Sequence, residues 1–239
     1  MSTDKRDPTL NANGLVYGLQ EFSAPDVNIL DPARNTLTRL TAPVRDADTP
    51  FMNPQFVFQS SPYNEEEVVW SGKASLHNPM MDHEGRVWMT HTIRAPQTPA
   101  FCREGSSHPS AQLFPVESSQ RHLSVFDPTT GEFTLIDTCF GTHHLQIAED
   151  TDNTVWASNP GSPVVGWLNM RRFDETGDEQ RSQGWCPYIL DTNGNGRQDE
   201  YVEPDQPIDP TRDKRIAGGS YGIVPNPVDG SIWVAQGYN

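Results

Sequence analysis

The sequence has no long apolar run and few basic residues. No stretch approaches the roughly 18 apolar residues that a membrane-spanning helix needs, so we expect no membrane span. The chain carries 17 Lys and Arg against 32 Asp and Glu, which gives a formal net charge of −15. Such a charge repels nucleic acid and attracts cations, so we expect no nucleic-acid partner.

Sequence motifs of several enzyme classes are absent as well. The chain has no Gly-rich phosphate loop, no Gly-x-Ser-x-Gly elbow and no paired glycosidase-like carboxylates in a defined context. Residues 1–10 lack the apolar segment of a signal peptide, because the charged run from Asp4 to Asp7 leads directly into Pro8. We therefore expect no signal peptide in this chain.

Cysteine is scarce, with Cys102, Cys139 and Cys186 as the three thiols of the sequence. They allow at most one internal disulfide. One alternative is three unrelated buried thiols. The other is a Cys102–Cys139 disulfide that joins a long loop to the end of a strand, which would suit an exported protein.

Helix-period stretches are also scarce, whereas 21 Pro and 18 Gly favour many short strands joined by turns. A short pattern recurs along the chain, with a polar turn that contains Gly or Asn, then an apolar residue and a large aromatic. Its copies are 11–17, 82–90, 150–156 and 227–233, with the aromatics Tyr17, Trp88, Trp156 and Trp233. Each copy predicts a β-hairpin.

A second hairpin repeats with an Asp-Pro turn, at 27–40 and again, without a gap, at 123–136. One hairpin of each kind makes four antiparallel strands, which is typical of a propeller blade. We expect an all-β β-propeller in a single domain, 1–239, with blades of about 70 residues and long insertions. The expected units are 6–75, 76–141, 142–218 and an incomplete 219–239, a partial or open array of three to four blades. Open arrays expose strand edges, so we expect self-association or missing blades.

The first pattern resembles the β-propeller superfamily that includes the streptogramin lyases and the NHL-type propellers. Asp82, Gly85, Val87, Trp88 and Thr90 carry this resemblance. The segments 127–128, 139–144 and 191–209 are similar to uncharacterised secreted bacterial propeller proteins, some of which carry a carboxypeptidase-regulatory-like domain. The resemblance implies a periplasmic or extracellular location, and a His acid/base with a bound magnesium ion.

Histidines cluster where strands are expected to begin. His77 precedes the turn at Asp82, and His143 and His144 precede the turn at Asp150. Such positions face the axis of a propeller, so these imidazoles could bind a divalent metal or act as general acid and base. Alternatively, they hydrogen-bond to neighbouring loops. The remaining histidines, His83, His91, His108 and His122, are expected on solvated turns or loops.

A calcium-loop pattern lies within residues 191–199. Side-chain oxygens stand at relative positions 1, 3, 5 and 9, with Gly196 at 6 and a backbone carbonyl at 7, as in the front of a calcium loop. The usual Glu at position 12 is replaced by Val202, although Glu200 or Glu203 could supply oxygens. The alternative is a polar turn that bonds to its own backbone. The candidate ligands are Asp191, Asn193, Asn195, Arg197 and Asp199.

Two functions follow from these features. The first is a binding or scaffold propeller with a structural calcium ion and a polar axial pocket for a small-molecule or polysaccharide-type ligand. The alternative is a streptogramin lyase-like, metal-assisted lyase or hydrolase that uses His77, His143 and His144. A shared metal requires the three imidazoles to converge, because metal–nitrogen distances are about 2.1 Å.

Overall fold

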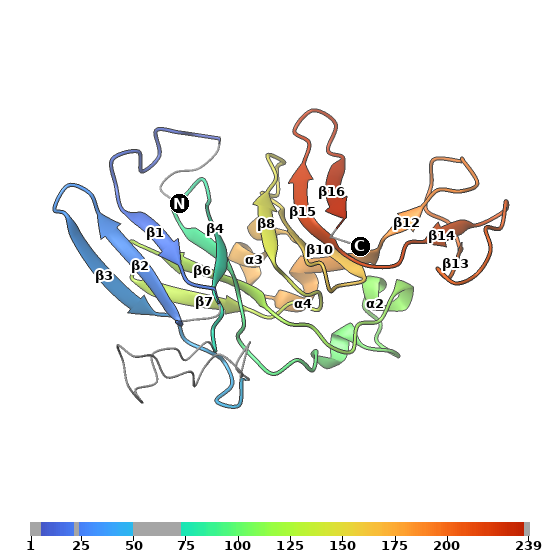
Figure 1. Cartoon of the computed structure of the whole chain (residues 1–239), viewed down its shortest axis with the longest axis horizontal. Coiled ribbons are helices and arrows are strands. Elements are labelled where there is room, and N and C mark those ends of the chain that lie inside the picture. The colour runs from blue at the N-terminus through green and yellow to red at the C-terminus, as the bar shows by residue number, and fades with distance from the viewer. Residues whose placement is uncertain (1–5, 22–23, 50–72, 237–239) are drawn as a thin grey trace, which may run out of the picture.

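The computed structural model describes residues 6–21, 24–49 and 73–236. The regular structure of this part of the chain is mostly β-strand, arranged in sheets that are antiparallel except for one pair of strands, with three short α-helices. The first three sheets follow one another in chain order along the longest axis of the molecule, the C-terminal hairpin lies beside the third sheet, and the insertion extends beyond it (Figure 1). The all-β class predicted from the sequence is therefore confirmed.

The first sheet has three strands and the next two have four each. The first sheet contains β1 (Val16–Leu19), β2 (Asp26–Asp31) and β3 (Thr36–Thr41). The second contains β4 (His77–Met81), β5 (Val87–His91), β6 (His122–Asp127) and β7 (Glu132–Ile136). The third contains β8 (His144–Ile147), β9 (Val155–Ser158), β10 (Val164–Leu168) and β11 (Gln183–Pro187). Both predicted Asp-Pro hairpins are present, as β2–β3 and β6–β7.

The chain continues into an insertion and a C-terminal hairpin. The insertion sheet has the order β12-β14-β13, and its β13–β14 pair is parallel. Its strands are β12 (Ile189–Leu190), β13 (Tyr201–Val202) and β14 (Asp213–Arg215), and the C-terminal hairpin is β15 (Ser220–Pro225) and β16 (Ile232–Gln236). Among the described residues, no sheet closes on itself and no strand precedes the turn at Asn11. Four strands per unit are thus found in the second and third sheets alone, and residues 50–72 of the first expected unit lie outside the described part.

The helices fill two long connections. The 3-10 helix η1 (Ala100–Cys102) and α2 (Pro109–Leu113) lie between β5 and β6, whereas α3 (Met170–Thr176) and α4 (Glu179–Ser182) join β10 to β11. The Asn169 side chain caps α3 by accepting from the N–H of Arg172, and Gly177 ends it with a φ of 64°. The sequence pattern did not predict α3 and α4.

The recurring Asp and Trp of the second sheet are structural. The buried Asp82 carboxylate accepts hydrogen bonds from the backbone of Glu84 and Arg86 and, at 2.8 Å, from the indole N–H of Trp88. Trp88 has no exposed surface and packs in one cluster with Leu145 and other apolar residues of the third sheet. In this copy, the motif therefore sets the turn and the packing between the second and third sheets.

Two further expectations concern cysteines and histidines. Cys102 and Cys139 form a disulfide, with their Cα atoms 5.3 Å apart, while Cys186 is a free thiol. The prediction of solvated histidines is correct for His83 and wrong for three others. His91 and His122 are fully buried opposite each other on β5 and β6, because the strands extend into the expected loops. The third, His108, is buried and stacks on Trp185, with ring centroids 4.7 Å apart.

Candidate functional site

Three imidazoles meet where β4 and β8 begin. His77 is the first residue of β4, His144 is the first of β8, and His143 precedes it. One ring nitrogen from each of the three lies within 4.8 Å of the others. The convergence required for a shared metal is thus present, and among the described residues no other group of three His, Cys, Asp or Glu side chains meets this criterion.

The backbone around this histidine cluster has unusual conformations. Ser75, Asn78 and Arg121 adopt positive φ angles of 41°, 48° and 54°. The β4–β5 register shifts between His77 and Met80, where Asn78 lies. Such left-handed residues each cost about 1–3 kcal/mol and tend to occur at functional sites. The Asn78 side chain accepts a 2.8 Å hydrogen bond from the N–H of Leu145, which fixes β4 against β8.

A backbone carbonyl determines the tautomer of His144. Its Nδ1 lies 2.8 Å from the carbonyl oxygen of Tyr221, at the start of β15. Because a carbonyl can only accept, Nδ1 carries the proton, and the neutral ring keeps its lone pair on Nε2. That Nε2 lies 3.2 Å from Nε2 of His77. The geometry resembles the outer contacts that orient metal-binding imidazoles.

Glu21 and Arg121 complete the polar part of the cluster. The carboxylate of Glu21 lies 3.5 Å from Nδ1 of His77 and 3.5 Å from Nε2 of His143. It also forms an ion pair with the guanidinium of Arg121, whose side chain is almost fully buried. Arg121 donates a further 3.1 Å hydrogen bond to the hydroxyl of Ser75. One carboxylate is therefore shared by two imidazoles and one guanidinium.

The imidazoles of His77 and His143 favour the neutral form. Burial, with the nearby His144 and Arg121, lowers the pKa of His143 to about 4. The pKa of His77 is lowered chiefly by burial, although Glu21 opposes this shift. Neutral imidazole is the form that binds metal ions, so the two rings are in the ligand state near neutral pH.

The spacing fits a transition metal after small side-chain rotations. A tetrahedral ion bound at about 2.1 Å needs ligand nitrogens about 3.4 Å apart. Nε2 of His77 and Nε2 of His144 already have nearly this separation, and the longest nitrogen–nitrogen distance in the cluster must shorten by at most about 1.4 Å. Nδ1 of His143 is buried and has no hydrogen-bond partner in the described structure, which leaves that nitrogen available as a ligand.

An aromatic side chain borders the histidine cluster. The ring of Tyr221 meets the ring of His144 edge-on, with centroids 4.6 Å apart, and lies 5.1 Å from the ring of His143. The backbone carbonyl of Tyr221 also accepts a 2.9 Å hydrogen bond from the hydroxyl of Ser158. The C-terminal hairpin thus positions two of the three imidazoles.

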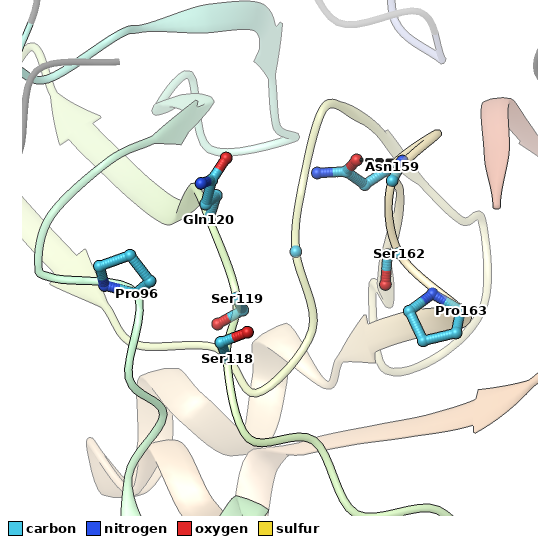
Figure 2. A pocket seen from close by; sticks show the side chains of 9 residues that line it. Pro96, Ser118, Ser119, Gln120, Asn159, Ser162 and Pro163 are labelled. Carbon is cyan, nitrogen blue, oxygen red and sulfur yellow. Dashed lines mark hydrogen bonds between the residues drawn. The ribbon is translucent and has the colours of Figure 1, made fainter. Parts of the chain in front are cut away.

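A polar cavity of about 310 Å³ lies next to these strand ends. Pro96 and residues 118–120 lie on one side, and Asn159, Ser162 and Pro163 lie on the other (Figure 2). Among the described residues that line it, none has a titratable side chain. It is close to the cluster along the chain, because Gln120 precedes Arg121 and Gly141 comes two residues before His143.

The predicted calcium ligands lie in the insertion, away from the histidine cluster in the fold. In the described structure the Asp191 carboxylate accepts hydrogen bonds from the backbone of Gly194, Asn195 and Gly196. The Asp199 carboxylate accepts from the side chains of Asn193 and Asn195. The backbone N–H of Arg197 donates to the side chain of Asn195. These bonds match the polar-turn alternative, and the calcium site stays a prediction.

Three parts of the site were missed from the sequence: Glu21, Arg121 and the carbonyl of Tyr221. Glu21 and Arg121 are 100 residues apart and belong to neither repeated motif. Arg121 directly precedes β6, so the strand-start position that marked His77 could have identified it as well. For Glu21, which follows β1, no such signal exists.

No protein-family model matches the chain, and no curated protein matches it. In the described residues, no helix has both the length and the apolar composition to cross a membrane. Folds of this class host enzymes and scaffolds alike, so function must be inferred from the chemistry of the site.

Proposed function

We propose that this chain is a propeller-type protein, related to the streptogramin lyases, that binds a divalent metal ion and acts as a metal-assisted lyase or hydrolase. The observation that carries the proposal is the convergence of His77, His143 and His144. A bound divalent ion would supply Lewis acidity to a substrate oxygen. Three imidazole ligands leave a fourth position for that oxygen, as in catalytic zinc sites.

The surrounding residues support this assignment. Glu21 is placed to accept a hydrogen bond from Nδ1–H of His77, which would keep the lone pair of the ring on Nε2 for a metal ion. The Tyr221 carbonyl does the same for His144. Arg121 compensates the charge of Glu21 and holds the carboxylate between the two rings.

Metal binding is tested by calorimetric titration of Zn²⁺, Mn²⁺ and Mg²⁺ into the chelator-treated protein. We expect Zn²⁺ to bind with one ion per chain, and His77→Gln to weaken binding at least about tenfold. His83→Gln is the matched control, because His83 is half-exposed and lies on the turn after β4. Equal Zn²⁺ affinity in wild type and His77→Gln would contradict the proposal.

The reaction class is tested with a streptogramin-type cyclic depsipeptide as the probe substrate. A lyase opens the ring without a change in mass, whereas a hydrolase adds one water molecule, and mass spectrometry separates the two products. We expect turnover that depends on the metal and is lost in His144→Gln. Metal binding without turnover of this probe would support the metal site but contradict an activity on cyclic depsipeptides.

The polar cavity supports a second candidate, a binding module for neutral polar small molecules or polysaccharide-type ligands. Hydroxyl and amide groups line it, including the Ser118 hydroxyl and the Gln120 amide. Such groups match uncharged polar ligands. The probe is a series of neutral oligosaccharides in saturation-transfer NMR. Signal transfer that Gln120→Ala abolishes, together with an absence of any turnover, would favour this candidate.

A location outside the cytoplasm belongs to the same proposal. Structural disulfides persist in oxidising compartments and are rare in the cytosol, so the Cys102–Cys139 pair supports a periplasmic or extracellular protein. Mass spectrometry of alkylated protein from its native host tests this, because a cytosolic protein would carry alkyl groups on all three cysteines.

A further inference from the structure

The insertion holds a buried carboxylate that lacks half of its hydrogen bonds. Asp213 begins β14 and has no exposed surface. Its Oδ2 accepts a 2.8 Å hydrogen bond from the backbone N–H of Asp199, while its Oδ1 has no partner among the described residues. A buried carboxylate oxygen without a partner destabilises the fold unless a cation or a donor reaches it.

Strand pairing places this oxygen beside the calcium-loop pattern. β13 and β14 pair in parallel, with Tyr201 opposite Asp213, so Asp213 lies next to the end of the 191–199 loop. Asp191 and Asp213 line the same cavity, of about 480 Å³. The backbone N–H of Asp213 also donates a 2.9 Å hydrogen bond to the carbonyl of Glu200, which fixes the start of β14.

We propose that Asp213 is the missing acidic ligand of a calcium site formed with Asp191 and the other oxygens of the 191–199 loop. The loop supplies oxygens at the front positions of a calcium loop but has Val202 where a Glu is usual. Asp213 reaches the site from a different strand and replaces that Glu. This site is separate from the histidine cluster, so it does not depend on the function proposed above.

The ligand atoms of the proposed site favour a hard cation. All candidate ligands are oxygen atoms, and Asp191 and Asp213 supply two carboxylates, which suits Ca²⁺ rather than Zn²⁺. The hydrogen bond from Gly196 occupies one acceptor position on Asp191 Oδ2 and leaves another open. The ion would bridge the 191–199 loop to β14 and so stabilise the insertion as one unit.

The test uses calcium chloride with the chelator-treated full chain and compares wild type, Asp213→Asn and Asp205→Asn. Asp205 is an exposed residue of the same insertion and serves as the matched control. We expect one Ca²⁺ per chain in wild type and in Asp205→Asn, and an affinity at least about tenfold lower in Asp213→Asn. Magnesium chloride in the same titration should bind far more weakly.

Thermal denaturation separates a ligand from a purely structural role. We expect Ca²⁺ to raise the Tm of wild type but not of Asp213→Asn. Without Ca²⁺, Asp213→Asn should be as stable as wild type or more stable, because the unpaired buried charge is gone. The proposal is overturned if wild type binds no Ca²⁺, if Asp213→Asn binds it equally well, or if the substitution lowers the Tm by the same amount with and without Ca²⁺.

Discussion

The contact between His77 and His144 is the residue-scale feature that most favours a metal. With Nδ1–H of His144 bound to a carbonyl, the 3.2 Å contact between the two Nε2 atoms needs a proton from His77. If Nε2 of a neutral His77 carries the proton, its Nδ1 has only a lone pair. This lone pair faces the carboxylate of Glu21, so two acceptors repel each other. A metal ion bound by the two Nε2 atoms would relieve this repulsion, because Nδ1 of His77 could then carry the proton and donate to Glu21.

Buried histidines make the stability of the protein depend on pH. Burial lowers the pKa of His91 from its usual 6.5 to about 3, so the folded protein leaves it neutral where the unfolded chain protonates it. The contribution of neutral His91 to the free energy of unfolding is fully present above about pH 6.5. It declines, by up to about 1.4 kcal/mol per pH unit, as the pH falls towards 3. Urea denaturation between pH 7 and pH 4 measures this, and His91→Gln should show a shallower decline. An identical decline of the free energy of unfolding in wild type and His91→Gln would contradict this role of His91.

At the scale of elements, the repeated hairpins could be predicted and the contacts between repeats could not. The Asp-Pro turn and the alternation beside it are local, so β2–β3 and β6–β7 follow from the sequence. The same repeat placed His77 and His144 at strand starts. Glu21 lies in no repeat, and its position beside the imidazoles depends on how the first sheet packs against the second.

The approach of β15 to the loop after β9 requires glycine. A Cβ at Gly219 would lie 2.2 Å from the carbonyl oxygen of Asn159 and 2.4 Å from that of Ser162, and backbone cannot move aside as a side chain can. We expect Gly219→Ala to destabilise the protein by about 1–3 kcal/mol. Gly222→Ala is the control, because its Cβ meets Ala235 at an ordinary 3.7 Å. Urea denaturation giving equal losses for the two variants would contradict this assignment.

The disulfide links the connection between β5 and β6 to the segment after β7. Replacing Cys102 and Cys139 together by Ser should lower the free energy of unfolding by about 2–4 kcal/mol, since 37 residues separate them. Cys186→Ser removes a free thiol instead and should change it by less than about 1 kcal/mol. Chemical denaturation compares the variants, and a double variant as stable as wild type would show that the disulfide adds nothing.

At the scale of the whole molecule, the C-terminal hairpin exposes an apolar face. Trp88 is fully buried by the next sheet, whereas its counterpart Trp233 is 69% exposed, beside the exposed Val224. We expect a second copy to cover this face, so that the average mass in sedimentation equilibrium rises with concentration in wild type and not in Trp233→Ser. A wild-type mass that stays monomeric at every concentration would contradict self-association.

The central claim is that His77, His143 and His144 bind one metal ion between them. Crystals of the protein grown with zinc, measured at the zinc absorption edge, test it most directly. The predicted result is an anomalous difference peak about 2.1 Å from one ring nitrogen of each histidine. The contradicting result is a cluster without such a peak, in which Nε2 of His77 still donates its hydrogen bond to Nε2 of His144.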